Sequence, residues 1–279
     1  MSETNGASAW SAARGDKWRA HLAGMEATLE PIDDPLLTAL ELDAPYRIAE
    51  IGCGGGGTAL QIVDRAPAGS VVHGFDIAPG LVEIARSRVP PDARDLVFTV
   101  ADMAKTAPEQ RYDRLVSRLG IMFFDEPAAA FANLAHWLVP GGRFAFAAWN
   151  KPAENPWMAT VREVVAQLVD LPPPEPNAPG PFRYGDIDLL RGLLDGAGFS
   201  EVDARPWRGA LTIGGGLPPA QAARFALAAF STFADLLAQA GDAALAAAQH
   251  ALTARFDEHV DGKVVKLGAA VHIVTGTVR

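Results

Sequence analysis

The chain has 279 residues, of which 49% are hydrophobic and 20% charged; this is ordinary for a globular protein and excludes disorder throughout. Its 24 Lys and Arg against 33 Asp and Glu give a formal net charge of −9, which argues against nucleic-acid and anionic-membrane partners. The single cysteine, Cys53, excludes an internal disulfide framework and a zinc site of several cysteines. Without a signal-peptide pattern or a long apolar run, we expect a cytoplasmic protein.

The N-terminal residues 1–43 are predicted to form a helical lid. Apolar side chains recur there at spacings of three and four residues, as Trp18, Leu22, Met25 and Leu29 show. A pair of prolines interrupts this pattern, so more than one helix is expected.

Residues 44–150 alternate short apolar strands with helices. The expected strands are Tyr46–Ile51, Val71–Asp76, Leu96–Ala101, Tyr112–Ser117 and Arg143–Trp149. The expected helices are Thr58–Arg65, Pro79–Val89 and Ala128–Leu138. This alternation with short turns indicates βαβ units, and the predicted fold class is α/β with a doubly wound Rossmann-like sheet, mostly parallel.

Residues 151–279 are expected to form a helical cap, or substrate region, with strands that return to the sheet. The predicted helices are Trp157–Val169, Ile187–Ala197 and an Ala-rich stretch from Pro218 to Phe256, broken near Gly241. A Pro-rich loop separates the first two. Strands are expected at Glu201–Pro206 and Ala269–Thr277, the last one antiparallel to the sheet.

A glycine motif, Gly52-x-Gly54-x-x-Gly57, follows the first strand and opens a helix. Glycines let the backbone turn tightly against a ligand, and the helix N-terminus offers free N–H groups. Asp76 ends the second strand, where a carboxylate can accept hydrogen bonds from ribose hydroxyls. The pattern indicates a cofactor that contains a nucleoside.

Two further acids narrow the choice of cofactor. Glu50 stands two residues before Gly52, so its carboxylate faces the same crevice. That charge disfavours a pyrophosphate and suits a cofactor with an ammonium or sulfonium group. Asp102 ends the third strand, where it could hold an adenine amino group.

These segments resemble the ordered motifs of class I S-adenosylmethionine-dependent methyltransferases, in particular bacterial small-molecule enzymes of the ubiquinone/menaquinone-biosynthesis type. The segments that carry the resemblance are Ala49–Thr58, Gly74–Ile77, Ala101–Met103, Arg111–Phe124 and Leu138–Arg143. Trp10 and Trp18 resemble a tryptophan pair in the leading helices of such proteins. The run of four glycines departs from the family, which more often has a threonine or serine there, and should loosen the loop.

The resemblance implies a site for S-adenosyl-L-methionine. Its methionine and sulfonium end would be lined by Glu50, Gly52, Cys53, Gly54, Ser117 and Leu119. Its ribose and adenine end would be held by Asp76, Ile77, Ala101, Asp102 and Met103. Trp10 and Trp18 either cover the cofactor or pack in the core.

Apolar and aromatic residues near strand ends are candidate walls of an acceptor site, with core packing as the alternative. They are Met122, Phe123, Trp149, Trp157 and Tyr184.

Few groups are candidates for acid–base or nucleophilic chemistry. His21 stands near the expected entrance and is the candidate general base, which is needed only when the nucleophile carries a proton. His272 is predicted to pack within the last strand, and Cys53 to pack beside the cofactor rather than act as a nucleophile. The sequence shows no cluster of metal ligands, so metal independence is expected.

We therefore expect a transferase that moves a methyl group to a small, apolar or aromatic acceptor by in-line displacement. The partner is a small molecule, and a homodimer is left open. Two alternatives also remain: a protein that binds S-adenosylmethionine without methylating, and a nicotinamide-dependent oxidoreductase.

Overall fold

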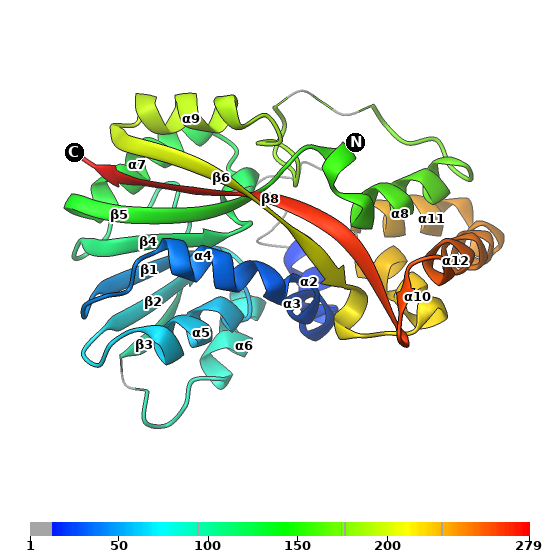
Figure 1. Cartoon of the computed structure of the whole chain (residues 1–279), viewed down its shortest axis with the longest axis horizontal. Coiled ribbons are helices and arrows are strands. Elements are labelled where there is room, and N and C mark those ends of the chain that lie inside the picture. The colour runs from blue at the N-terminus through cyan, green and yellow to red at the C-terminus, as the bar shows by residue number, and fades with distance from the viewer. Residues whose placement is uncertain (1–12, 94, 174, 176, 230) are drawn as a thin grey trace.

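The computed structural model describes residues 13–279 except 94, 174, 176 and 230. Its centre is a twisted sheet with the strand order β3-β2-β1-β4-β5-β8-β6, and β7 pairs with β8 outside this path (Figure 1). The first five strands are parallel: β1 (Arg47–Ile51), β2 (Val71–Asp76), β3 (Leu96–Val100), β4 (Tyr112–Arg118) and β5 (Leu138–Trp149). The antiparallel strands are β6 (Phe199–Thr212), β7 (Val260–Asp261) and β8 (Val264–Val278). The predicted α/β class with an antiparallel C-terminal strand is confirmed.

The order of the strands places the helices on both faces of the sheet. The chain moves outward from β1 to β2 and β3, and in the opposite direction from β4 to β5. Because such crossovers are right-handed, α5 and α6 cover one face and α7 the other. The helices of this part are α4 (Asp33–Ala39), α5 (Gly57–Arg65), α6 (Pro79–Ser87), α7 (Pro127–Trp137) and α9 (Ile187–Gly196).

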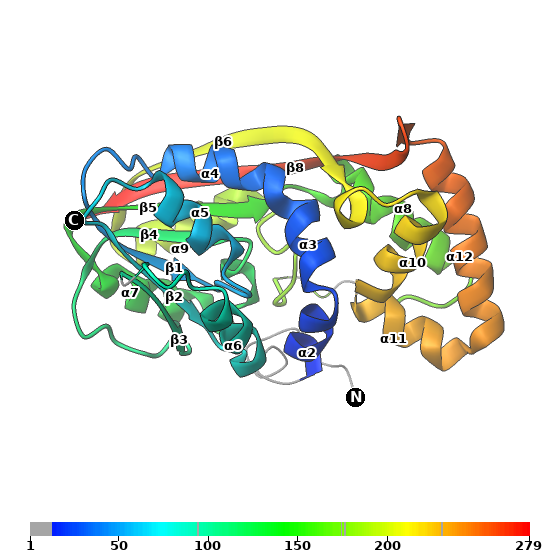
Figure 2. The ribbon, with the colours of Figure 1, turned by 90° about the horizontal axis from the view of Figure 1, so that it is seen from below.

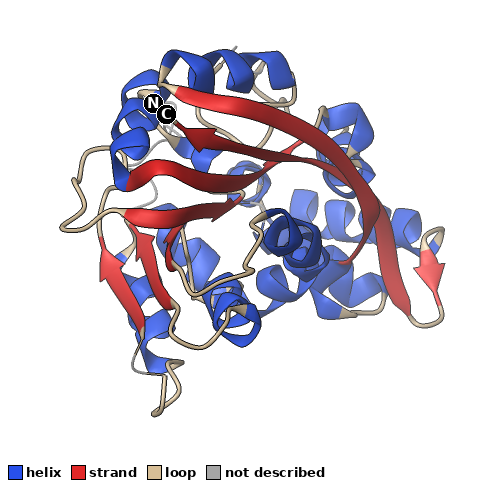
Figure 3. Ribbon diagram, turned by 60° about the vertical axis from the view of Figure 1, so that its left-hand side comes forward, coloured by secondary structure: helices blue, strands red, loops and turns tan. Residues whose placement is uncertain are grey.

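A second group of helices lies beyond the sheet, around the far ends of β6 and β8 (Figures 1 and 2). It consists of α8 (Pro156–Ala166), α10 (Pro219–Ala229), α11 (Ser231–Ala240) and α12 (Asp242–Asp257). The last pair between β5 and β8 is Trp149 with Val271, whereas β6 pairs with β8 as far as Thr212 with Lys266. The β6–β8 ribbon therefore leaves the sheet and curves into this helical lobe (Figure 3).

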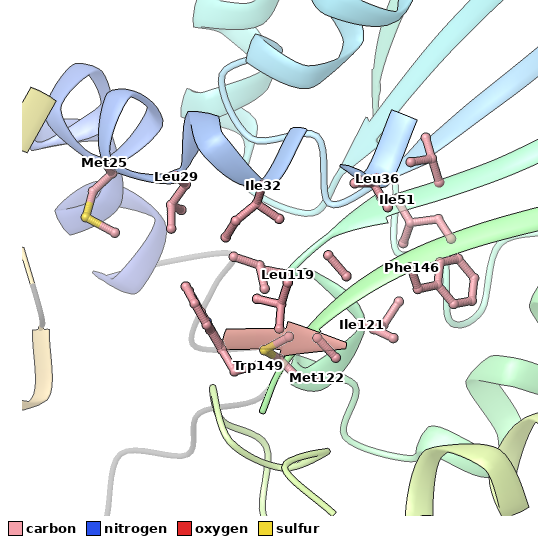
Figure 4. Packing of buried hydrophobic residues seen from close by; sticks show 14 of the residues in the cluster. Met25, Leu29, Ile32, Leu36, Ile51, Leu119, Ile121, Met122, Phe146 and Trp149 are labelled. Atoms are coloured by element: carbon pink, nitrogen blue, oxygen red, sulfur yellow. The ribbon is translucent and has the colours of Figure 1, made fainter. Parts of the chain in front are cut away.

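The N-terminal segment bridges the sheet and the helical lobe (Figure 2). It contains α2 (Ala13–Ala20), α3 (Leu22–Leu29) and the short helix η1 (Glu30–Ile32), which leads into α4. Three more short helices, η2 (Ile121–Phe123), η3 (Pro152–Glu154) and η4 (Ile213–Gly215), lie in connections. Figure 4 shows Ile32 facing Leu119 at the end of β4, with Trp149 nearby, so the N-terminal segment closes the apolar core at this edge.

The element boundaries differ from the sequence prediction mainly in three long strands, of which β5 begins at Leu138 rather than Arg143. β6 continues past the predicted end at Pro206 to Thr212, and β8 begins at Val264 rather than Ala269. The extra residues include Gly209 and Ala210, which have low intrinsic strand propensity. Pairing between β6 and β8 along the ribbon keeps these residues extended. Because this contact is non-local, it has no local sequence signal.

Candidate functional site

The glycine loop lies at the carboxyl end of β1. Gly52, Gly54 and Gly56 have φ angles of +68°, +53° and +85°, which L-residues rarely adopt. The backbone N–H of Gly52 donates to the carbonyl of Phe75 on β2 at 2.8 Å, which ties the loop to the neighbouring strand. The loop runs into α5, whose first N–H groups face the same edge of the sheet.

Asp76 is oriented by the glycine loop. Its carboxylate accepts hydrogen bonds from the N–H groups of Gly54 at 2.8 Å and Ala78 at 2.9 Å. Burial raises the pKa of Asp76, and the hydrogen bonds from Ala78, Gly54 and Ile77 oppose this rise. The carboxylate is thus held at the carboxyl end of β2, directly beside the loop.

Among the acidic side chains at this edge of the sheet, Glu50 has the most strongly shifted pKa. Its side chain is buried, and Oε2 has no hydrogen-bond partner among the residues that the structure describes. Burial raises the pKa of Glu50 to about 8, Arg118 lowers it, and Asp33 and Asp76 raise it further. A cation bound nearby would favour the ionised carboxylate.

Arg118 and Asp33 form a buried ion pair behind the glycine loop. Arg118 Nη1 lies 2.7 Å from Asp33 Oδ2, and Thr58 and Gln61 of α5 also donate to this carboxylate. A cavity of about 300 Å³ opens here, lined by Ala23, Glu26, Ala27, Glu30, Asp33, Gly57, Gln61 and Arg118. The sequence did not predict this network, because a contact between residues 85 positions apart leaves no local pattern. Arg118 itself stands in the segment Arg111–Phe124, which carries part of the resemblance.

The N-terminal helices lie against the loop. A Cβ placed on Gly54 would lie 3.9 Å from Trp18 Nε1, so the indole of α2 borders the loop. Arg88 donates to the Gly55 carbonyl at 2.8 Å and pairs with Glu26 of α3 at 2.9 Å. Trp18 therefore lies beside the site, whereas Trp10 falls outside the described residues.

The third strand brings the next acid close to Asp76. Ala101 donates its N–H to the Asp76 carbonyl at 2.9 Å, so the turn after β3 is fixed to the end of β2. The Asp102 carboxylate accepts from the N–H of Ala104 at 3.0 Å and pairs with Lys105 at 3.1 Å. Met103 is buried beside them. The five residues predicted for the ribose and adenine end thus lie along one edge.

The end of β4 packs tightly against the end of β1. Ser117 Oγ donates to the Ile51 carbonyl at 2.8 Å, and a Cβ on Gly52 would meet Gly120 Cα at 3.3 Å. Leu119 has a φ of +63°, a strained conformation for a leucine that is often found at functional sites. Ser117 and Leu119 thus border the glycine loop on the side opposite to β2.

Cys53 behaves as an inert buried thiol. Burial raises its pKa well above the ordinary value, and the nearby Glu50 and Asp76 raise it further. A thiol that resists ionisation is a poor nucleophile, in line with the packing role predicted for it.

The candidate acceptor residues lie at the ends of β4 and β5. Met122, Trp149, Trp157 and Tyr184 are buried, while Phe123 is half-buried. The rings of Trp149 and Trp157 are 4.7 Å apart, a close aromatic contact. Met122 and Trp149 lie close to Leu119 (Figure 4), and the part of the five residues in acceptor binding remains a prediction.

His21 lies between the N-terminal helices and the helical lobe. Its ring meets Phe225 of α10 edge-on at 6.1 Å. Within the described residues, no three His, Cys, Asp or Glu side chains converge on a metal position. In the same part of the chain, no helix combines the length and apolarity needed to cross a membrane.

The segment that builds this edge of the sheet is similar to known methyltransferases. Residues 48–142 match the family described as a methyltransferase domain. Trans-aconitate 2-methyltransferase from Methylobacterium nodulans is 34% identical over 110 residues, 39% of this chain and 41% of that protein. Demethylmenaquinone methyltransferase from Thermus thermophilus is 33% identical over 113 residues, 40% of this chain and 51% of that protein. The aligned segment spans about half or less of these relatives.

A solved structure supports the fold over a longer stretch. The YcgJ protein from Bacillus subtilis superposes with a TM-score of 0.56 at 17% identity, covering 90% of this chain and 98% of that one. At this identity the likeness concerns the fold alone. The matched sequence, in contrast, spans the glycine loop and the ends of β2 and β3, and on this ground residues 48–142 are similar to the methyltransferase domains of class I S-adenosylmethionine-dependent enzymes.

Proposed function

We propose that the protein transfers the methyl group of S-adenosylmethionine to a small, apolar or aromatic acceptor by in-line displacement. The observation that carries this proposal is the buried Glu50 carboxylate beside the glycine loop, whose Oε2 meets no partner in the described part of the chain. A buried carboxylate oxygen without a partner fits a cationic cofactor, and an ionised carboxylate would repel a pyrophosphate.

The residues present fit S-adenosylmethionine, which supplies when bound an activated methyl group on a sulfonium leaving group. Glu50 and the backbone of Gly52 and Gly54 would hold its methionine part. Cys53 would line this part of the site as a small buried residue. Ser117 and Leu119 would border the sulfonium at the end of β4.

The ribose and adenine part would lie along the ends of β2 and β3. The Asp76 carboxylate, already fixed by backbone N–H groups, would accept the two ribose hydroxyls. Ile77 would pack on the adenine, while Asp102 and Met103 would contact its amino group and face. Trp18, which borders Gly54, would cover the cofactor and exclude water.

The acceptor would bind over the ends of β4 and β5, against Met122, Phe123, Trp149, Trp157 and Tyr184. The apolar lining supports a small apolar ligand. The similar relatives are named for trans-aconitate and demethylmenaquinone, and both of those names describe small acceptors. The chain's main task is then to align acceptor, methyl carbon and sulfur.

Calorimetric titration tests the cofactor first, with S-adenosylmethionine, S-adenosylhomocysteine and NADH as ligands. We expect micromolar binding of the two sulfur nucleosides and no binding of NADH. Tight binding of NADH would instead support the oxidoreductase alternative. Bound S-adenosylmethionine with no S-adenosylhomocysteine formed across a broad acceptor panel would indicate the non-methylating alternative.

A further inference from the structure

Two buried polar atoms near the proposed acceptor region lack hydrogen-bond partners among the described residues. Tyr184 Oη and His272 Nε2 have no hydrogen-bond partner among the described residues and essentially no solvent contact. Polar atoms in that state are rare in folded proteins, and a ligand group that bonds to them would remove the cost of their burial.

The two side chains lie on the same face of the sheet. His272 on β8 stands directly opposite Ala148 on β5, so it shares a face with Ala148 and with Phe146 two residues earlier. Phe146 contacts Phe131 of α7 at 6.4 Å, and Phe131 contacts Tyr184 at 6.3 Å. Both orphaned atoms therefore belong to the face that α7 covers.

The turn that carries Tyr184 also holds the ring of His272. His272 hydrogen-bonds the backbone of Gly185, and the Gly185 N–H is already donated to the Phe182 carbonyl at 3.0 Å. Nε2 has no partner within the described chain, so it is the ring nitrogen left for a ligand. A neutral imidazole with its proton on Nδ1 carries a lone pair on Nε2, and that nitrogen is a base.

This pair lies at the edge of the sheet where the cofactor site lies. A Cβ on Gly185 would lie 3.2 Å from Lys151 Cα, just beyond the end of β5. Strands are spaced about 4.8 Å apart, so β8 is three strand steps from β1 and two from β4. The end of β4, where the sulfonium would lie, and this region are therefore neighbouring parts of one edge of the sheet.

We propose that Tyr184 and His272 bind the reacting hydroxyl of a phenolic or enolic acceptor, and that His272 Nε2 takes its proton. This inference rests on the proposed methyl transfer. The acceptor O–H bond breaks and its proton goes to Nε2, while Tyr184 Oη donates a hydrogen bond to the acceptor oxygen. That oxygen forms a bond to the methyl carbon, and the carbon–sulfur bond breaks with its electron pair left on sulfur. The imidazolium then releases the proton to water.

Both side chains are in the protonation states that this step needs. Burial lowers the pKa of His272, Glu154 raises it, and Arg191 and Arg208 lower it, so the ring is neutral near pH 7. Burial raises the pKa of Tyr184 to about 12, so its hydroxyl stays a donor.

The chain provides a matched control pair. His73 Nδ1 and Tyr112 Oη hydrogen-bond each other at 2.7 Å, on β2 and at the start of β4. The variants are His272→Asn, whose amide can still donate to Gly185, and Tyr184→Phe, with His73→Asn and Tyr112→Phe as controls. The probes are phenol and 4-nitrophenol, with methyl-labelled S-adenosylmethionine as the methyl donor.

For phenol we expect His272→Asn to lower kcat/KM about 100- to 10,000-fold and to remove the acidic limb of the pH profile. For 4-nitrophenol, which is largely ionised near neutral pH, the loss should stay below about tenfold because no proton has to be removed. The control variants should methylate both phenols at the wild-type rate. An equal loss for both probes would show a structural role, and unchanged phenol methylation in His272→Asn would overturn the proposal.

Binding provides a readout independent of turnover. Tyr184→Phe should weaken phenol binding to the S-adenosylhomocysteine complex several-fold without lowering the melting temperature, since its hydroxyl bonds to nothing in the described protein. Tyr112→Phe should lower the melting temperature because it breaks the bond to His73. Unaltered phenol binding in Tyr184→Phe would overturn the role of the hydroxyl.

Wild-type protein that binds S-adenosylmethionine but methylates neither phenol would overturn this inference alone. A protein that binds neither sulfur nucleoside would overturn the proposed function itself. The two failures are therefore distinguishable.

Discussion

Lys17 of α2 and Asp235 of α11 form an ion pair, with Nζ 2.6 Å from Oδ1, that joins the helix beside the glycine loop to the helical lobe. One helix further on, Thr28 Oγ1 accepts the N–H of Gly214 at 2.9 Å and repeats the link. Trp18, adjacent to Lys17, borders Gly54 on the other side. A single N-terminal segment thus contacts the proposed cofactor loop and the lobe that would cover the acceptor.

The Lys17–Asp235 pair should stabilise the fold only modestly. Its two side chains are 33% and 36% exposed, and pairs of this kind contribute about 0.2–1 kcal/mol. We expect a double-mutant cycle of Lys17→Met and Asp235→Asn, followed by urea unfolding, to give a coupling in this range that shrinks at high salt. The more exposed pair of Arg191 and Asp188 is the control and should show no measurable coupling. A Lys17–Asp235 coupling that salt does not reduce would contradict this expectation.

Glu50 should make the cofactor-free protein less stable as the pH rises. Its pKa is raised from 4.5 to about 8, so the folded chain retains a proton that the unfolded chain has released. This contribution is fully present below pH 4.5 and is lost as the pH rises through about 8, to a total of about 5 kcal/mol. Glu50→Gln, neutral at every pH, should remove this slope. Urea unfolding at pH 5, 7 and 9 checks it, and parallel pH profiles for wild type and variant would contradict it.

The charge on Glu50 should also discriminate between the two sulfur nucleosides. S-adenosylmethionine carries a sulfonium charge that S-adenosylhomocysteine lacks, so Glu50→Gln should weaken binding of the former more. If the difference between the two binding free energies shrinks by about 1.4 kcal/mol, the ratio of the two dissociation constants changes tenfold. Asp102→Asn, at the proposed adenine end, should weaken both ligands equally and provides the comparison. Equal losses in Glu50→Gln would argue against a carboxylate near the sulfonium.

The glycine loop, Asp76 and Asp102 could be predicted from the sequence because each stands at a strand end with a local pattern. β1, β2 and β4 end within one residue of the predicted positions for the same reason. Gly54 and Asp76, 22 residues apart, then meet through the parallel pairing of neighbouring strands.

The buried network behind the loop could not be predicted in this way. Asp33 stands in no local pattern that would indicate this role, yet its carboxylate accepts hydrogen bonds from Arg118, Thr58 and Gln61. These residues come from β4 and α5, and only the packing of α4 over both elements brings them together. For His272 the sequence likewise predicted only packing within the last strand. The surroundings of its ring include Gly185, which lies 87 residues away in the chain and leaves no local pattern.

Two glycines should respond in opposite ways to the same substitution. Gly74→Ala would place a Cβ 2.5 Å from Phe98 Cδ1 and 3.0 Å from Cys53 Cβ, so the strand and the loop must shift. Overpacking of this kind costs about 1–3 kcal/mol. Gly192 lies in α9 with nothing within 4 Å of its Cβ position, and Gly192→Ala should stabilise by about 0.5–1 kcal/mol. Thermal and urea unfolding test both changes, and destabilisation by Gly192→Ala would contradict the packing seen here.

Asp76 should carry much of the cofactor affinity. Hydrogen bonds to a charged group contribute about 1.5–3 kcal/mol each, so loss of the carboxylate in Asp76→Ala should weaken both sulfur nucleosides about 100-fold or more. The same change removes the acceptor for the N–H groups of Gly54 and Ala78 and should loosen the glycine loop.

Asp76→Asn separates these two effects, because its amide oxygen can still accept one backbone N–H. We expect both variants to bind S-adenosylmethionine weakly, but Asp76→Asn should be destabilised less than Asp76→Ala because one of the two backbone N–H groups keeps its acceptor. Calorimetry and urea unfolding on the same samples provide both quantities. Tight binding retained by either variant would mean that a group other than the Asp76 carboxylate at the end of β2 holds the ribose hydroxyls.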